Sequence, residues 1–157
     1  MKNMKSQAAL EFLMTYGWAI LVVLVAVGAL AYFGVLNPDR FLPTKCTLQA
    51  GIACLDHKVQ GTAGAGGVGI VTARITNSLG YGIDTISVKA GNCGDYPGSA
   101  GSTGSLTMAN GASSTYTIPC SAALTGAKYN QQLNVSYRNT DTQITHENIG
   151  QIISAIG

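Results

Sequence analysis

The sequence is poor in the residues that enzymatic chemistry usually requires. Only 10% of its residues are charged, and His57 and His146 are its two histidines. The carboxylates are scattered singly, so no pair suits general acid and base roles. Asp56 adjoins His57, but neighbours in a strand point to opposite faces, so this adjacency does not make a catalytic dyad. We therefore expect no enzyme, and an anchored hydrolase lacks residues to support it.

Signals for phosphate and nucleic acid are also weak. The glycine-rich stretches 61–67 and 91–112 contain no GxxxxGK[ST] motif and no GxGxxG between a strand and a helix, so we interpret them as exposed loops. The formal net charge is +2, but without Lys2 and Lys5 seven basic residues face seven acidic ones. No basic face for nucleic acid is evident, and no cofactor is expected.

One long apolar run lies near the N-terminus. From Phe12 to Leu36, 25 consecutive residues carry no charge. At about 1.5 Å per residue, a helix of this length crosses a hydrocarbon layer of about 30 Å. Pro38 disfavours helical geometry in the residue before it. The sequence therefore predicts a membrane helix over residues 7–37 and a short neck over residues 38–44.

A small residue precedes this run. A secretory signal carries its small-residue cleavage site after the apolar run, so that the run is discarded. Here Ser6 follows Lys5 and precedes the run. A cut between Ser6 and Gln7 would remove residues 1–6 as a leader and leave the whole helix on the product. This arrangement is typical of a building block that is stored in the membrane and later withdrawn from it.

The residues around this junction form a distinctive pattern, which consists of Lys5, Ser6, Gln7, Glu11, Phe12, Leu13, Thr15, Tyr16, Gly17, Trp18 and Ala19. Residues 2–36 resemble the class III signal peptide of archaeal type IV pilins. The resemblance implies cleavage after Ser6 by a prepilin peptidase and a mature chain that starts at Gln7. It also implies polymerisation of the chain with itself, and a role for Glu11 in subunit registry. Ser6 stands where the family often has Gly, and Ala9 where it often has Ser.

The position of Glu11 has a physical interpretation beside the resemblance. A carboxylate in lipid costs on the order of 3 kcal/mol, and less near the boundary. Gln7 and Glu11 are four residues apart and so lie on one helical face. Cleavage would create an α-ammonium on Gln7, and a carboxylate in a low-dielectric core needs such a cation nearby. Either this pair sets the axial stagger between subunits, or Glu11 lies in the headgroup layer near Lys5.

Two glycines interrupt the apolar run. Gly17 and Gly28 are eleven residues apart, which is about three turns, so they fall on nearly the same helical face. Small residues permit close approach of helix backbones. The spacing is not a GxxxG motif, and a contact role in assembly is a hypothesis.

After Thr44 the pattern changes to short alternating segments that are separated by glycine and polar turns. About seven short strands with regular turn signals predict an antiparallel β-sandwich of immunoglobulin-like or Greek-key type. The predicted fold class is therefore α+β, with a long N-terminal apolar helix and a β head over residues 45–157.

Individual strands follow from the alternation of apolar residues. Residues 68–77 and 82–90 are separated by the turn-rich SLGY and predict a hairpin. Residues 113–118 and 131–138 predict two more strands, residues 105–108 a short one, and the tail after residue 142 another pair. In the segments 68–77, 82–90 and 131–138, the residues expected to face the core are Val71, Ala73, Ile75, Ile86, Val88, Leu133, Val135 and Tyr137. Ile83 is expected on the outer face of the second segment.

All four cysteines follow the helix. An even number in a chain with an export-type leader favours disulfides in an oxidising exterior. We predict Cys46 with Cys54, closing a hairpin-like segment, and Cys93 with Cys120, closing a long loop. Loop closure gives roughly 2 to 4 kcal/mol for each bond. A zinc site with His57 near Cys54 is the rival interpretation, but no CxxC pair exists.

Asn134, Val135 and Ser136 form the single N-x-[ST] sequon of the chain. In the expected strand Asn134 faces away from Leu133 and Val135, so a glycan there would lie outside the core. Asn134 is therefore a candidate for N-glycosylation after export.

These observations favour a structural subunit of an archaeal type IV pilus-like surface filament, serving adhesion or surface attachment. We expect a single-pass membrane protein that is extracted by an assembly platform and its ATPase and then becomes an extracellular filament. The alternatives are an archaellin, which shares the signal type, and a membrane-anchored extracellular binding module that does not polymerise.

Overall fold

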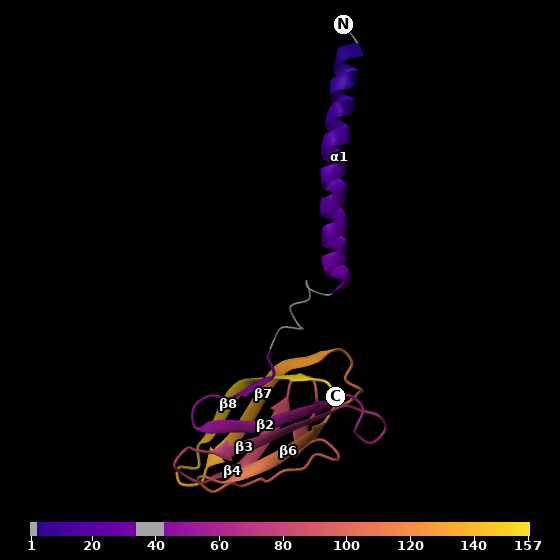
Figure 1. Cartoon of the computed structure of the whole chain (residues 1–157). Coiled ribbons are helices and arrows are strands. Elements are labelled where there is room, and N and C mark those ends of the chain that lie inside the picture. Colours follow the sequence, from indigo (N-terminus) through magenta and orange to yellow (C-terminus); the bar gives the residue numbers. More distant parts are fainter. Residues whose placement is uncertain (1–2, 34–42) are drawn as a thin grey trace. The chain divides into compact units, whose positions relative to one another are not determined.

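The computed structural model of the protein describes residues 3–33 and 43–157. The chain divides into two units, residues 1–41 with the helix and residues 42–157 with all the strands (Figure 1). The two units are described separately below.

Helix α1 (Asn3–Tyr32) forms the first unit. Alanine, leucine and methionine favour helix, and no proline or charged residue interrupts the segment after Glu11. The Thr15 hydroxyl donates a hydrogen bond to the Glu11 carbonyl oxygen over 2.9 Å, and the rings of Phe12 and Tyr16 stack at 4.4 Å. The helix begins before the predicted start at residue 7, whereas the predicted end at residue 37 and neck residues 38–42 lie outside the described residues.

The second unit contains eight strands among the described residues. They are β1 (Lys45–Thr47), β2 (Ile52–Gln60), β3 (Ile70–Asn77), β4 (Ile83–Ala90), β5 (Asp95–Tyr96), β6 (Ser113–Pro119), β7 (Lys128–Asn139) and β8 (Thr145–Ala155). They form a five-stranded sheet in the order β1-β8-β7-β4-β5 and a three-stranded sheet in the order β2-β3-β6. All the pairings within the sheets are antiparallel. The predicted antiparallel β-sandwich is confirmed.

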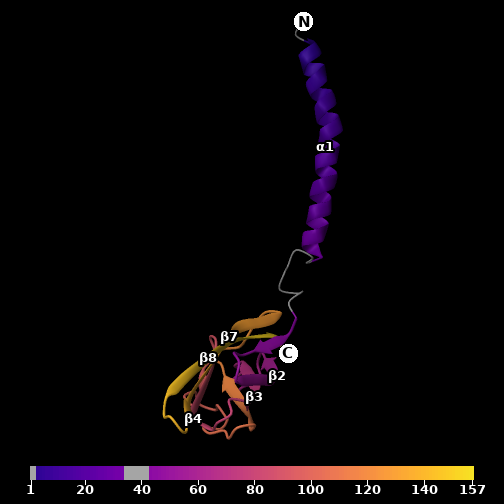
Figure 2. The same cartoon turned by 90° about the vertical axis from the view of Figure 1, so that its left-hand side faces the viewer.

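The two sheets face each other across one apolar core. Figure 2 shows β4, β7 and β8 on one side of the head and β2 and β3 on the other. The predicted inward faces of β3 and β7 are confirmed, since Val71, Ala73 and Ile75 are fully buried and Leu133 and Val135 with them. Between the sheets, the rings of Tyr96 and Tyr116 meet edge to face at 5.3 Å. Burial of such side chains from both sheets stabilises the head.

The predicted hairpin of residues 68–77 and 82–90 is wrong. Strand β3 pairs with β2 and β6, while β4 pairs with β5 and β7, so the segment between β3 and β4 crosses from one sheet to the other. Alternation shows which residues face a core but not which strand lies alongside.

The face of β4 also differs from its expectation. The register between β4 and β7 shifts between Asp84 and Ser87, and Thr85 has a positive φ of 48°. This bulge adds one residue, so Ile83 and Ile86 both point inward, and Ile83 is 1% exposed. The expectation that Ile83 faces outward is therefore wrong.

Two further strand predictions need correction. The tail forms one long strand, β8, that pairs with β7 over its whole length, and not a pair of strands. Residues 105–108 form no strand; Met108 makes an isolated bridge with Ile83. The strand predicted at 131–138 is longer than expected and spans Lys128–Asn139.

Candidate functional site

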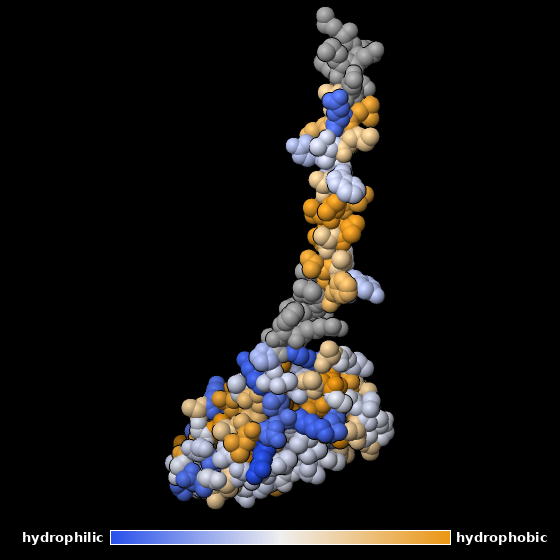
Figure 3. Space-filling view, in the orientation of Figure 1, coloured by the Kyte–Doolittle hydropathy of each residue, from blue (hydrophilic) through white to orange (hydrophobic). Residues whose placement is uncertain are grey.

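The surface of α1 is the most unusual feature of the molecule. Residues Ala8–Tyr32 are long and apolar enough to cross a membrane, and none of the most apolar window is buried inside the chain. Leu13 and Leu24 are 65% and 66% exposed. Figure 3 shows apolar side chains along much of the helix, whereas the head mixes polar and apolar patches. An apolar surface of this extent marks an interaction with lipid or protein.

Glu11 lies at the start of this apolar surface. Its side chain is exposed and lines a shallow hollow with Leu10, Met14 and Thr15. Gln7 lies one turn earlier in the same helix, so the predicted spacing of the two residues along one face is present. The predicted cleavage residues Lys5 and Ser6 also lie in α1. Whether Gln7 and Glu11 form a pair between subunits stays a prediction.

The two helix glycines have open surroundings. A Cβ atom built on Gly17 or Gly28 would meet nothing within 4 Å. The single chain therefore gives no packing reason for glycine at either position. Their proposed contact role in assembly stays a prediction.

The four cysteines pair as predicted. Cys46 bonds to Cys54 with a Cα–Cα distance of 5.8 Å, and Cys93 bonds to Cys120 with a Cα–Cα distance of 4.0 Å. Cys46 and Cys54 do not belong to one hairpin, however, since β1 and β2 lie in different sheets. Cys93 follows β4 and Cys120 follows β6, so this bond also joins chain segments from the two sheets. Both sulfur pairs are thus held within disulfides.

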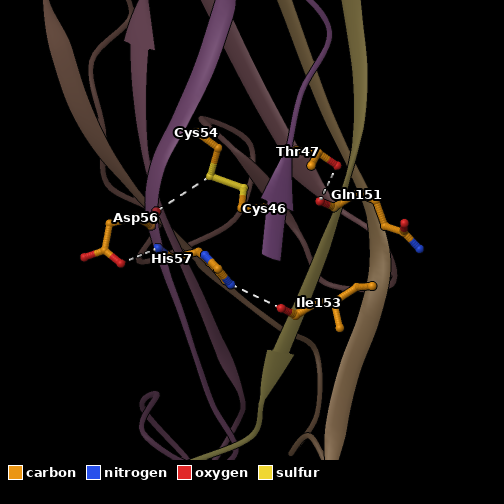
Figure 4. The surroundings of a disulfide bond; sticks show 7 residues. All are labelled: Cys46, Thr47, Cys54, Asp56, His57, Gln151 and Ile153. Atoms are coloured by element: carbon orange, nitrogen blue, oxygen red, sulfur yellow. Dashed lines mark hydrogen bonds between the residues drawn. A yellow bond between two sulfur atoms is a disulfide. The ribbon is translucent and has the colours of Figure 1, made fainter. Parts of the chain in front are cut away.

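The Cys46–Cys54 disulfide has a histidine beside it. Figure 4 shows His57 extending toward Ile153 in β8 while Asp56 points away from the disulfide. His57 Nε2 lies 3.1 Å from the Ile153 carbonyl oxygen, and Asp56 Oδ1 accepts a hydrogen bond from the His57 backbone N–H at 2.8 Å. The sulfur atoms and a ring nitrogen of His57 lie within 4.8 Å of one another. Because the two sulfurs are bonded to each other, they are not free thiolate ligands for zinc.

A bulge in β2 explains this arrangement. The register between β2 and β3 shifts between Cys54 and Asp56. The extra residue lets Cys54 and His57 lie on the same side although they are three positions apart. Strict alternation would have placed Cys54 and His57 on opposite faces of the strand.

The two glycine-rich stretches meet at the Cys93–Cys120 disulfide. They line one side of an open hollow of about 570 Å³, to which Gly64 and Ala65 contribute from the first stretch and Gly94, Ser99 and Gly101 from the second. No charged side chain of the described residues lines it. Glycine spacing predicted exposed loops, but it gave no signal that the two loops share a surface.

Asn134 lies on the outer face of the five-stranded sheet. It is half-buried between Lys89 of β4 and Ile149 of β8, and its Nδ2 donates a hydrogen bond to Glu147 Oε1. Its Oδ1 is buried and has no hydrogen-bond partner among the described residues. The side chain faces away from the core as expected. Glycan attachment stays a prediction.

Burial and ion pairing shift several pKa values in the head. Arg138 donates to Asp84 from Nε over 2.8 Å and from Nη2 over 3.0 Å, and this hydrogen bonding lowers the pKa of Asp84. Burial raises the pKa of Tyr116 and of Tyr129 to about 12 each. The Tyr129 hydroxyl donates to the Ala90 carbonyl oxygen over 2.8 Å, close to Cys93. The sequence did not predict the ion pair of Asp84 and Arg138, because these residues are 54 positions apart.

Comparison with known proteins identifies no family for this chain. No protein-family model matches the chain, and no curated protein matches it. The crystal structure of a FixG-related protein from Vibrio parahaemolyticus is similar at 14% identity, with a TM-score of 0.36, over 71% of this chain and 94% of that one. A likeness this distant supports no conclusion about function.

Proposed function

We propose that the protein is a structural subunit of an archaeal type IV pilus-like surface filament. The observation that carries this proposal is the exposed apolar surface of helix α1, with the single carboxylate Glu11 near its start, in a chain whose β head is disulfide-bonded. The head accounts for its own core without α1. The apolar surface of α1 therefore needs a partner, and lipid and copies of the same helix both fit it.

Storage and assembly use the same surface at different times. Lipid chains are as apolar as leucine, so moving α1 from the bilayer into a helical bundle gains little hydrophobic free energy. An ATP-driven assembly platform would supply the work of extraction. Once outside, the bundle is stable because its separation would expose the side chains of α1 to water. Close approach of neighbouring helices would use Gly17 and Gly28, where no side chain stands in the way.

Glu11 gives the bundle its register. Cleavage after Ser6 by a prepilin peptidase leaves an α-ammonium on Gln7, and this cation offsets the cost of burying the carboxylate. A subunit shifted along the bundle would bury Glu11 without a cation. One axial position is therefore preferred over the others.

The head would face outward and mediate adhesion or surface attachment. Both disulfides suit an oxidising exterior, and a glycan on Asn134 would lie on the outer face of the sandwich. The role is structural and not catalytic. An archaellin is close in class, because it shares the signal type.

A membrane-anchored binding module is the second candidate, and the hollow beside Cys93–Cys120 favours it. That module would use the same helix as an anchor without polymerising. It predicts monomers in detergent, whereas the subunit predicts fibres that can be sheared from cells.

Replacement of Glu11 tests the proposal. We expect Glu11→Gln to abolish filaments or make them irregular, because the variant lacks the charge that fixes the register. Electron microscopy of shear-released material is the measurement. The control is Asp141→Asn, which removes a carboxylate from the exposed loop after β7 and leaves α1 untouched. Normal filaments from Glu11→Gln would reject the role of Glu11, and absence of filaments from the unaltered chain would reject the proposed function.

A further inference from the structure

We propose that the Cys46–Cys54 disulfide is a mechanical anchor that passes tension from the N-terminal helix into the core of the head. This inference rests on the proposed function, because a filament subunit is held by its helix while its head contacts a surface. It assigns the first disulfide a task that the second does not share.

The order of the chain brings tension to Cys46 almost at once. Strand β1 is the first strand after α1 along the chain, and Cys46 is its second residue. A pull on the helix is transmitted through the covalent backbone to Lys45 and then to Cys46. Whatever holds Cys46 therefore resists the pull.

Backbone pairing alone holds β1 weakly. Strand β1 has three residues, lies at the edge of the five-stranded sheet and pairs only with β8, at Lys45 with Ile153, Cys46 with Ile152 and Thr47 with Gln151. Three pairs at a sheet edge can be pulled apart without disturbing the rest of the sheet. Edge strands with few pairings open more easily than the core strands of a sheet.

The disulfide connects β1 to a much stronger element. Cys54 lies in β2, which pairs with β3 at eight positions from Ile52 to Gln60. Strand β3 lies between β2 and β6 in the middle of its sheet. The far end of β2 is also tied to the C-terminal residues, since Gly157 N–H donates to the Val59 carbonyl oxygen over 3.1 Å. Tension at Cys46 thus enters the three-stranded sheet through a covalent bond.

The surroundings hold this connection in one place. A Cβ atom on Gly150 of β8 would lie 1.9 Å from the Thr47 carbonyl oxygen, so glycine permits the close approach of the two strands. The Asn148 side chain accepts from the Gln49 N–H over 2.8 Å and donates to the Gln49 carbonyl oxygen over 3.0 Å. His57 reaches from β2 to the Ile153 carbonyl oxygen. These contacts fix β1 and the segment after it against β8.

The second disulfide provides an internal comparison. Cys93–Cys120 lies beyond β4 and β6 and is not between the helix and the first sheet pairings. Its sequence separation is 27, against 8 for Cys46–Cys54. Loop-closure entropy grows with loop length, so Cys93–Cys120 stabilises the folded head more. Loss of Cys93–Cys120 should therefore lower Tm more, whereas loss of Cys46–Cys54 should lower the first unfolding force more.

Force spectroscopy on the full chain in detergent tests this ranking. Handles are attached through azide-bearing residues at Thr44, just before β1, and at Thr142, in the exposed loop after β7. For the Cys46→Ser and Cys54→Ser double variant we expect an early event at lower force than the first event of the unaltered chain. Its extension should be at most about 25 Å, because residues 45–51 extend by at most about 3.5 Å each and the folded head already spans part of that distance. The Cys93→Ser and Cys120→Ser double variant should keep the unaltered force and lose more in Tm.

A second attachment point separates the anchor from general destabilisation. Leu55 of β2 is 58% exposed and lies beyond the disulfide. In the oxidised, unaltered chain, pulling from Thr44 and pulling from Leu55 should give the same first unfolding force, a comparison that needs no cysteine variant. In the Cys46→Ser and Cys54→Ser variant, pulling from Leu55 should restore the unaltered force.

Unequal forces from Thr44 and Leu55 in the oxidised chain would overturn the anchor, as would an unchanged first event in the Cys46→Ser and Cys54→Ser variant. Filaments are scored separately by electron microscopy. A chain that forms no filaments but gives equal forces would reject the proposed function and leave the mechanical property of the head in place.

Discussion

Single polar side chains of the head complete backbone pairings that the strands leave open. Buried Asn77 donates from Nδ2 to the Tyr81 carbonyl oxygen over 2.8 Å and accepts from the Leu79 N–H over 3.1 Å. Asn148 accepts from the Gln49 N–H and donates to the Gln49 carbonyl oxygen. Buried polar groups are costly unless they are hydrogen-bonded. These asparagines therefore fix the loops that follow β3 and β1, and no local sequence pattern shows which asparagine serves in this way.

The ion pair of Asp84 and Arg138 predicts an acid-dependent part of the stability. The pKa of Asp84 is lowered from 3.8 in the folded head, so the pair stabilises the fold above about pH 4 and its contribution is lost as the pH falls through the folded pKa. Because both side chains remain partly exposed to water, the effect is small. We expect Asp84→Asn to lower Tm by a few degrees at most at pH 7 and by less near pH 2.

Thermal unfolding followed by circular dichroism across this pH range is the measurement. Asp141→Asn, which removes a carboxylate without an arginine hydrogen bond among the described residues, serves as the control. An equal loss of Tm for Asp84→Asn at pH 7 and pH 2 would show that the ion pair is not the cause.

Among the secondary-structure elements, the junction of β1 with β8 depends on one glycine. Gly150→Ala would place a methyl group 1.9 Å from the Thr47 carbonyl oxygen, so one of the two strands must move. We expect a loss of about 1–3 kcal/mol in the free energy of unfolding, as for other overpacked sites. Chemical denaturation is the measurement, and Gln132→Ala, at an exposed position of β7, is the control. Equal stability of the two variants would contradict the close packing of β1.

The elements also show where sequence reasoning succeeds and where it stops. Alternation identified the buried faces of β3 and β7, because side chains in a regular strand point inward at every second position. It failed at Thr85, since a bulge there shifts the alternation by one residue. It also could not tell that β3 and β4 belong to different sheets, because strand pairing depends on contacts between distant segments.

The candidate site could be predicted to a similar extent. Length and composition alone indicated the apolar helix, and loop closure gave both disulfide pairings. The hollow beside the two glycine-rich loops could not be predicted, because it depends on contacts between distant segments. The position of His57 on the same side of β2 as Cys54 could not be predicted either, because it depends on the bulge in β2. Gly150 and Asn148 of β8, which contact β1 and the segment after it, likewise have no local signal in the sequence.

At the scale of the whole molecule, the chain combines two units with opposite requirements. The head buries its apolar residues within itself, while α1 exposes them along its whole described length. A protein of this composition cannot leave its helix in water. We therefore expect the helix to stay on the mature protein and to exchange lipid for copies of itself.

Mass spectrometry of material sheared from the cell surface tests this claim most directly. The account predicts an N-terminal peptide that begins at Gln7 and continues into the sequence of α1. Material that still carries Met1, or material that contains the head without the helix, would contradict it.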